Sequence, residues 1–320
     1  MAVIGIDTGG TKIAGALMDE SGKILKKMRL PNTGRTGGSI MDAYRCIIRE
    51  LGKDAEYEAV GIGAGGRIEE HSGKVLYAVE IYKDYIGLEI KKILEQEFGK
   101  PVFVTNDCRA GLLGEVWLGA AKNYQKVLAL ILGTGVGGGV FYDGVLLDGS
   151  RGGMGEFGHM ILHNGGRLCA CGQRGCAEQY LSGTALWQRY NERVAKADDV
   201  GKRVGMKQGA ETKISSGYDF FKRQSQGDSL AGEILKEFTE DLAVCLVNLA
   251  NAFDPDALLI GGGLIDTREI WWDEMKQTYI SLGNLYVKHI PLLAAAYGND
   301  AALAGAAKFA LDGLRRNRGQ

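Results

Sequence analysis

The sequence has little that would suit it to a membrane, a nucleic acid or export. Among its 320 residues no unbroken apolar run is longer than six, as in Val127–Leu132, whereas a bilayer-spanning helix needs about 20. Because 38 Lys and Arg residues are balanced by 39 Asp and Glu, no basic surface is expected to follow phosphates or acidic lipids. The N-terminus reaches Asp7 without the basic segment of a secretory signal. We therefore expect a cytoplasmic protein without nucleic-acid or membrane partners.

Proline is also scarce, with 4 residues, whereas glycine is abundant, with 49. The glycines gather directly after apolar runs rather than in low-complexity stretches, which indicates places where the backbone approaches a ligand. Hydrophobic residues make up 45% and charged residues 24% of the chain, as in globular proteins with a sizeable core. A single core rarely grows beyond about 250–300 residues, so the length favours two domains.

Cysteine is sparse, and half of it is concentrated in one segment. Three of the 6 cysteines, Cys169, Cys171 and Cys176, lie within eight residues. Because disulfides are rare in a reducing compartment, the cluster predicts a metal site. Three thiolates and one imidazole form a closed tetrahedral zinc site of the structural kind. Two histidines upstream, His159 and His163, are candidates for the fourth ligand, and spacing alone does not choose between them.

One pattern of elements occurs twice along the chain. Residues 3–26 predict strand, glycine turn, strand, hairpin turn and strand, and residues 125–147 repeat that order. An internal duplication of this kind predicts two domains with the same start. The other elements we expect are strands over 59–66, 101–107 and 257–263, helices over 39–51, 88–99, 228–253 and 300–311, and an exposed loop over 196–217.

The two glycine turns are candidates for phosphate binding. Gly133, Gly135 and Gly138 match the dinucleotide fingerprint, but a strand rather than a helix follows, so the Rossmann mechanism is excluded. The sequence also lacks a P-loop motif. Turns between strands expose backbone N–H groups that can hold phosphate from two sides. The alternative is that both turns are simple hairpins.

Six motifs in their order along the chain are specific enough to indicate a family. They are DTGGTK near the N-terminus, TND, GTGVGGG, GEFGH, CACGQRGCAE and DPDALLIGGG. With them the chain, from about Val3 to Ala307, resembles the ROK (repressor, open reading frame, kinase) family. That resemblance implies an α/β fold of the two-lobed, duplicated actin/hexokinase-like (ribonuclease H-like) type. We expect one lobe to comprise residues 1–108 and 301–320, and a larger lobe with the zinc motif to comprise residues 109–300.

The resemblance also implies an activity: transfer of the γ-phosphate of MgATP to a sugar hydroxyl, commonly the 6-hydroxyl of glucose or of an N-acetylhexosamine. ATP and sugar would bind in the cleft of the fold, and the chain would form a homodimer. Phosphoryl transfer to an alcohol needs a base within hydrogen-bond reach of the attacking hydroxyl. Asp107, at the end of a predicted strand, matches the family's catalytic base. The alternative role for Asp107 is to cap the following helix.

Further site residues are carried over from the family's motifs. Those implied to bind the sugar are Gly65, Asn106, Asp107, Glu156, His159 and Glu178. Those implied to bind ATP and its phosphates are Asp7, Gly9, Gly10, Thr11, Lys12, Gly133, Thr134, Gly135, Gly137, Gly262 and Gly263. Asp7 would hold Mg²⁺, and zinc would be bound by His159, Cys169, Cys171 and Cys176, with the second ring nitrogen of His159 facing the sugar.

The chain departs from the family's pattern where the sugar would be selected. Many members have a Pro-Gly step where this chain reads GAGGR over 63–67, and the segment that often supplies an asparagine reads AVEIY over 78–82. This departure argues against glucose as the preferred substrate and favours a substituted hexose, such as an N-acetylhexosamine or a β-glucoside, with Glu80 or Arg67 in contact with it.

A sugar-sensing transcriptional repressor is the alternative from another class, because ROK repressors share the core and the zinc motif. Repressors carry a helix-turn-helix segment of some tens of residues ahead of the first strand. Here that strand begins at residue 3, and the predicted base and both phosphate turns are present. The sequence therefore favours the enzyme.

Overall fold

A computed structural model describes residues 1–34, 36–78, 83–203 and 213–319. The chain divides into two compact units. The first comprises Met1–Ala129, Gly138–Gly155 and Ala295–Gln320, and the second comprises Leu130–Gly137 and Glu156–Ala294. In the described ranges no helix is both long and apolar enough to cross a membrane. The two lobes expected from the sequence, 1–108 with 301–320 and 109–300, are defined by the fold family and not by compactness. Their boundaries stay a prediction.

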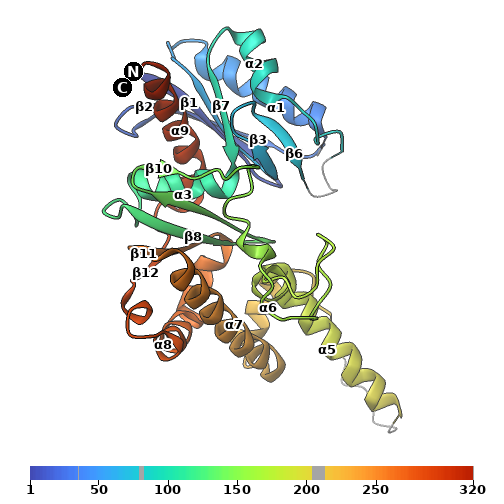
Figure 1. Ribbon diagram of the computed structural model, residues 1–320. Helices are drawn as coiled ribbons and strands as arrows, with labels where there is room; N and C mark the ends of the chain where they lie inside the picture. Colours follow the sequence, from blue (N-terminus) through green and yellow to red (C-terminus); the bar gives the residue numbers. More distant parts are fainter. Residues whose placement is uncertain (35, 79–82, 204–212, 320) are drawn as a thin grey trace. The chain divides into compact units, whose positions relative to one another are not determined.

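The first unit is built on a mixed five-stranded sheet (Figure 1). Its strand order is β3-β2-β1-β4-β7, with antiparallel pairing among the first three and parallel pairing from β1 to β7. The strands are β1 (Ala2–Thr8), β2 (Lys12–Asp19), β3 (Ile24–Pro31), β4 (Val60–Ala64) and β7 (Val102–Asn106). A hairpin of β5 (Arg67–Glu69) and β6 (Lys74–Tyr77) follows β4.

Helices cover both faces of this sheet. One face buries an aliphatic core against α1 (Gly37–Gly52) and α2 (Ile90–Phe98). Helix α1 begins earlier than the predicted start at residue 39: Thr36 is the N-cap, and Ser39 lies at the third helical position and completes a capping box with Thr36. The Thr36 side chain accepts from the Ser39 N–H, and the Ser39 hydroxyl accepts from the Thr36 N–H. Two backbone N–H groups at the start of the helix thus have partners.

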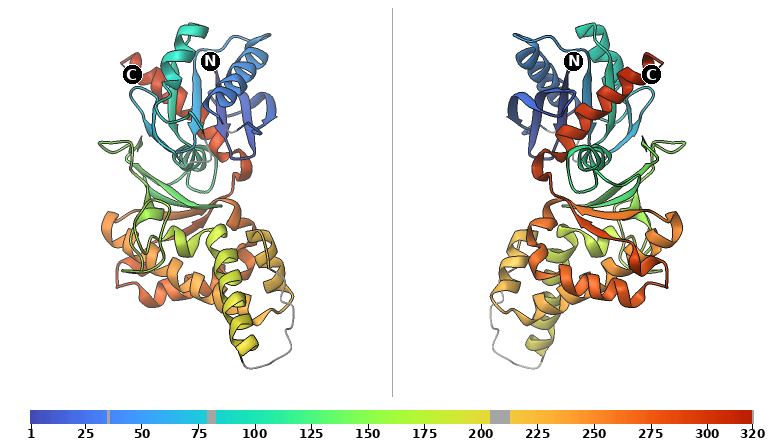
Figure 2. Two further views of the ribbon diagram at one scale, coloured as in Figure 1. Left: turned by 90° about the vertical axis from the view of Figure 1, so that its right-hand side faces the viewer. Right: turned by 90° about the vertical axis from the view of Figure 1, so that its left-hand side faces the viewer.

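The C-terminal helix α9 (Ala301–Asn317), predicted over 300–311, packs on the opposite face of this sheet (Figure 1, Figure 2). Small residues allow the close approach. A Cβ on Gly61 of β4 would lie 1.8 Å from the Ala306 carbonyl oxygen, so only glycine fits there. Helix α3 (Asp107–Leu118) packs beside α9, and a short helical turn η4 (Gly298–Asp300) leads into α9.

A second five-stranded sheet repeats the topology of the first. Its order is β10-β9-β8-β11-β12, so in both sheets the third, second, first, fourth and fifth strands lie in that sequence. The strands are β8 (Lys126–Leu132), β9 (Val136–Tyr142), β10 (Val145–Leu146), β11 (Ala257–Gly261) and β12 (Leu292–Ala294). The internal duplication predicted from the sequence is thereby confirmed.

Most of the second unit is helical. Its helices are α4 (Glu178–Leu181), α5 (Gly183–Arg203), α6 (Gly217–Ser225), α7 (Ser229–Phe253) and α8 (Trp272–Leu282), with short helical turns η1 (Phe157–His159), η2 (Gly263–Ile270) and η3 (Val287–His289). The prediction of an exposed loop over 196–217 is wrong for residues 196–203, where α5 continues. Residues 204–212 lie outside the described residues. A helix that has nucleated propagates at little cost, so it continues without an apolar pattern.

Candidate functional site

Three parallel strands of the first unit bring the predicted catalytic residues to one edge of its sheet. Asp7 of β1 pairs with Gly63 of β4, and Gly63 pairs with Thr105 of β7. Asn106 and Asp107 follow Thr105 directly. The carboxyl ends of β1, β4 and β7 therefore meet where an open α/β sheet usually binds its ligand.

Asn106 has the capping role that was considered for Asp107. Asn106 is the N-cap of α3: its Oδ1 accepts from the Cys108 N–H at 2.9 Å and the Arg109 N–H at 3.1 Å. Its Nδ2 donates to the Gly66 carbonyl at 2.9 Å and to Asp107 Oδ1 at 2.9 Å. Asp107 Oδ1 also accepts from the Cys108 N–H at 2.8 Å. The cap is thus mainly the work of Asn106, and the Asp107 carboxylate is held in a fixed orientation beside it.

The Asp107 carboxylate lies in an acidic environment. Burial raises the pKa of Asp7 to about 7, the negative charges of Asp107 and Asp300 add to the rise, and the positive charge of Lys12 opposes it. Asp300, which precedes α9, accepts from Lys27 Nζ at 2.5 Å and lies 3.5 Å from Arg29 Nη2. A partly buried carboxylate whose ionisation is this costly is suited to a cation. Gly65 borders the other oxygen of Asp107, since a Cβ there would lie 3.9 Å from Oδ2.

The first glycine turn, Thr8–Lys12, is fixed by a residue that the sequence analysis did not single out. Gly9 donates to the Lys12 carbonyl at 3.0 Å. The buried Asn32 donates from its side chain to the Gly9 carbonyl and from its backbone to the Thr11 carbonyl, both at 2.9 Å. Gly10, Thr11 and Lys12 are exposed at the tip of the turn. The turn is therefore held from behind, and its N–H groups, hydroxyl and ammonium can face a phosphate.

The second glycine turn, Gly133–Gly137, lies in the second unit. Gly133 donates to the Gly135 carbonyl at 2.9 Å, and its own carbonyl accepts from the Gly183 N–H at 2.8 Å. Gly262 lies beside the strand that leads into this turn, where its φ is 87° and a Cβ would be 2.3 Å from the Leu132 carbonyl oxygen. Thr134 is exposed. The structure thus places Gly262 close to the second turn, within one unit.

The three clustered cysteines and one histidine converge, as a metal site requires. The candidate ligand atoms of His159, Cys169, Cys171 and Cys176 all lie within 4.8 Å of one another. The Sγ atoms of Cys171 and Cys176 are 3.6 Å apart, and two sulfurs on a tetrahedral zinc at about 2.3 Å would be separated by about 3.8 Å. His159 Nδ1 is 3.9 Å from Cys169 Sγ. The cluster therefore has the donor set and spacing of a structural zinc site.

The thiol pKa values in this cluster are spread apart. Burial raises the pKa of Cys171, but hydrogen bonds from the Gln173 backbone and side chain and from the neighbouring thiols outweigh it and bring the pKa to about 7. Burial and those thiols raise the pKa of Cys176 to about 12. Several thiolates at this spacing need a cation between them.

His163, the other histidine candidate, lies in a different environment. Its Nε2 is 2.7 Å from Asp241 Oδ1 on α7, and its ring lies 4.3 Å from that of Tyr180. His159 instead directs Nδ1 toward Cys169 and Nε2 toward Glu156 Oε2, at 3.9 Å. The geometry therefore selects His159 over His163, the choice that sequence spacing left open.

Glu178, predicted to bind sugar, contacts the second glycine turn directly. Its Oε2 accepts from the Val136 N–H at 3.0 Å, and its Oε1 is 4.0 Å from Cys169 Sγ. No pattern in the sequence indicated the bond to Val136, because it joins residues 42 positions apart. Glu156 and His159 lie in the same unit as Glu178.

The residues considered for sugar selectivity are only partly described. Glu80 lies outside the described residues. The Arg67 guanidinium packs against the backbone of Gly153, where a Cβ would be 2.6 Å from Nη2.

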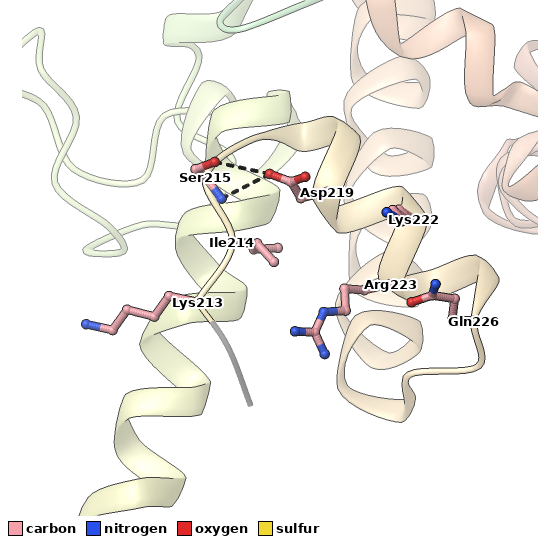
Figure 3. Close-up of a pocket in the computed structure, with 7 residues that line it drawn as sticks. All are labelled: Lys213, Ile214, Ser215, Asp219, Lys222, Arg223 and Gln226. Atoms are coloured by element: carbon pink, nitrogen blue, oxygen red, sulfur yellow. Dashed lines mark hydrogen bonds between the residues drawn. The ribbon is translucent and has the colours of Figure 1, made fainter. Parts of the chain in front are cut away.

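A hollow of about 380 Å³ in the second unit contains none of the predicted site residues. Its lining combines cations with one acid: Lys213, Ile214, Ser215, Asp219, Lys222, Arg223 and Gln226 (Figure 3). Asp219 accepts from the backbone and side chain of Ser215, both at 3.2 Å, and from Ser216 Oγ at 2.8 Å. The Asp219 carboxylate is thus occupied by hydrogen bonds at the start of α6.

Two further charged residues, which no motif in the sequence indicated, stabilise the first unit. Arg109 is buried and pairs with Asp148. Glu115, also buried, accepts from the backbone N–H groups of Ala120 at 2.8 Å, Tyr297 at 2.8 Å and Ala296 at 3.1 Å. Their partners lie 39 or more positions away, apart from Ala120, so only the folded structure could identify them.

Comparison with known proteins agrees with this arrangement. The sequence signature of the ROK family matches residues 3–313. The chain is 36% identical over 310 residues to a glucokinase of Streptomyces coelicolor, covering 96% of each chain. It is 31% identical to an N-acetyl-D-glucosamine kinase of Aliivibrio fischeri, over 95% of this chain and 97% of that one.

A solved structure gives the same result for the fold. A ROK family glucokinase from Streptomyces griseus, crystallised with glucose and AMPPNP, superposes with a TM-score of 0.80 at 35% identity. The alignment covers 98% of this chain and 100% of the other. The two-lobed actin/hexokinase-like fold expected from the sequence is thereby confirmed, and the chain belongs to the ROK family.

Proposed function

We propose that this protein is an ATP:sugar phosphotransferase that phosphorylates a hexose or hexose derivative, at the 6-hydroxyl. Membership of the ROK family and similarity to glucokinases and N-acetyl-D-glucosamine kinases over nearly the whole chain support this proposal. The observation that carries it is the acidic edge of the first sheet, where Asp107 is oriented by Asn106 and lies near Asp7. A carboxylate held in this way can accept the proton of an attacking hydroxyl.

ATP and Mg²⁺ fit the residues on the first unit. The pKa of Asp7 is raised because the carboxylate is buried and lies near the negative charges of Asp107 and Asp300, so a divalent cation would stabilise its ionised form. Mg²⁺ in such enzymes is typically held by one or two carboxylates together with substrate phosphates, whose charge it neutralises. We assign the metal to Asp7 and the phosphates to Gly9, Gly10, Thr11 and Lys12. From the second unit we add Gly133, Thr134, Gly135, Gly137, Gly262 and Gly263.

Zinc fits the second unit. We propose that His159, Cys169, Cys171 and Cys176 bind one structural zinc ion, whose charge stabilises the closely spaced thiolates. With Nδ1 of His159 on the metal, Nε2 stays on the side of Glu156. The metal would thus fix the histidine ring in the orientation that a sugar contact needs.

The sugar is assigned to Gly65, Asn106 and Asp107 on the first unit and to Glu156, His159 and Glu178 on the second. The side-chain Oδ1 of Asn106 already accepts hydrogen bonds at the start of α3. A sugar hydroxyl that donates to Oδ1 would therefore share this oxygen with the helix cap. Glucose and N-acetylhexosamines are the leading substrates, with β-glucosides as the alternative. The expected homodimer and cytoplasmic location remain predictions.

The experiment that tests this proposal uses a sugar and its 6-deoxy analogue. Purified protein with MgATP is given the preferred hexose, and the product is examined by phosphorus NMR. We expect a sugar 6-phosphate and an equal amount of ADP, and neither product from the 6-deoxy sugar. Phosphorylation of the 6-deoxy sugar would refute the assignment of the 6-hydroxyl, and ADP formation without any sugar phosphate would refute the transferase.

A further inference from the structure

The short helix α4 joins the cysteine cluster to the second glycine turn. It begins two residues after Cys176, one of the proposed zinc ligands. From this helix the Glu178 carboxylate accepts from the Val136 N–H at 3.0 Å. Just beyond the helix, the Gly183 N–H donates to the Gly133 carbonyl at 2.8 Å. The turn Gly133–Gly137 is therefore held at both of its ends by one segment of 6 residues, Glu178–Gly183.

Backbone hydrogen bonds also hold the chain next to this segment, where the cysteines lie. Ala177, between Cys176 and Glu178, donates to the Met160 carbonyl at 2.8 Å, one residue after His159. Leu162 donates to the Gly175 carbonyl at 2.8 Å. The two strands of chain that carry the proposed zinc ligands are thus bonded to each other beside α4. A change in the cluster must therefore move α4 or break these bonds.

The carboxylate of Glu178 lies directly against the turn. A Cβ on Gly135 would be 2.5 Å from Glu178 Oε2, so a side chain at Gly135 would displace the carboxylate. An acid this close to a phosphate site repels phosphate, so its presence there needs a compensating role. Its bond to the Val136 N–H gives it one, since an unpaired buried N–H would otherwise destabilise this conformation of the turn.

We propose that Glu178 is a positioning residue for the phosphate turn and links its shape to the metal-bound state of the cysteine cluster. This inference rests on the proposed function, in which Gly133–Gly137 meets the nucleotide. One carboxylate oxygen, Oε2, holds the turn through Val136, and the other, Oε1, lies on the side of Cys169. The predicted sugar contact of Glu178 would use the second oxygen, so the two roles are compatible on one side chain.

Two substitutions at Glu178 distinguish the hydrogen bond that holds the turn from the negative charge of the carboxylate. In Glu178→Gln an amide oxygen can still accept from the Val136 N–H, whereas in Glu178→Ala that acceptor is lost. We expect Glu178→Ala to weaken ADP binding in the absence of sugar by about three- to tenfold, the worth of one such hydrogen bond. We expect Glu178→Gln to bind ADP at least as tightly as the unchanged protein. The measurement is isothermal titration with MgADP on zinc-loaded protein.

The matched control is Glu156→Ala, which removes another carboxylate predicted to bind sugar. It should weaken sugar binding and leave ADP binding unchanged. Unchanged ADP binding in Glu178→Ala, or equal losses in Glu178→Ala and Glu178→Gln, would overturn the proposal. If the unchanged protein itself bound no ADP, the proposed kinase function would fail instead, so the two failures are distinguishable.

A second measurement tests the link to the metal and does not depend on the folding of Glu178→Ala. Zinc is removed from the unchanged protein and from Glu178→Gln, circular dichroism identifies the conditions in which each stays folded, and MgADP is titrated again. We expect zinc removal to weaken ADP binding about three- to tenfold in both proteins, and readdition of zinc to restore it. ADP binding that is the same with and without zinc would overturn the link.

Discussion

Asp7→Asn should stabilise the metal-free protein, and increasingly so as the pH rises. In the folded protein burial and neighbouring acids raise the pKa of Asp7 from 3.8 to about 7. The folded state therefore binds the proton of this carboxyl more tightly than the unfolded state does. By linkage, the free energy of unfolding falls as the pH increases from about 4 to about 7. An asparagine does not ionise, so its contribution to the free energy of unfolding does not change with pH.

The magnitude follows from the two pKa values. A shift from 3.8 to about 7 corresponds to about 4 kcal/mol once both states are ionised, near pH 8. At about pH 5.5 the folded protein is still protonated at Asp7, and the same relation gives about 2 kcal/mol. The stability difference between Asp7→Asn and the unchanged protein should therefore increase by about 2 kcal/mol over this pH range.

Urea unfolding at several pH values, without Mg²⁺ or nucleotide, measures this difference. Asp19→Asn is the control with the opposite sign: hydrogen bonds from Ser21 and Lys23 lower the pKa of the exposed Asp19. That variant should lose stability in the range where the unchanged carboxylate is ionised. A difference for Asp7→Asn that is constant with pH, or that decreases as the pH rises, would refute the account of the acidic edge.

Three other substitutions test the site and its support. Asp107→Asn should lower kcat about 10²–10⁴-fold while calorimetry finds sugar affinity nearly unchanged; a variant with full activity would exclude Asp107 as the base. His159→Ala should lose its zinc by metal analysis, whereas His163→Ala, which removes the bond to Asp241 and the contact with Tyr180, should retain it; equal zinc in both would contradict the ligand assignment. Glu115→Ala should lower the free energy of unfolding by about 3 kcal/mol, because it leaves buried N–H groups without an acceptor, and Glu115→Gln by less; urea unfolding without any such loss would show that those amides find other partners.

Features that depend on local sequence could be predicted well. The strands, the glycine turns and their duplication follow from short patterns, and the same strand order in the two sheets confirms the duplication. The helix predicted over 300–311 is present as α9, and its small residues pack against the first sheet. Residues of the ROK motifs could be assigned roles through the family resemblance alone, and those roles still await experiment.

Features that depend on contacts between distant residues could not be predicted. Asn32 holds the first turn through Gly9, 23 positions away, and Glu178 holds the second through Val136, 42 positions away. In both cases the side chain bonds to a backbone group, which every residue has. The sequence around Gly9 or Val136 therefore carries no sign of the bond. Spacing alone did not choose between His159 and His163; the family motif favoured His159, and in the structure it is His159 that lies with the three cysteines.

The most direct test of the central claim is ADP release from ATP in the presence of a panel of sugars. The panel contains glucose, mannose, fructose, allose, N-acetylglucosamine, N-acetylmannosamine and cellobiose, with protein that is folded and zinc-loaded. We predict that one sugar raises ADP release well above the others and above the rate without sugar. ADP release that no sugar in the panel increases would contradict the assignment of this protein as a kinase of glucose, an N-acetylhexosamine or a β-glucoside.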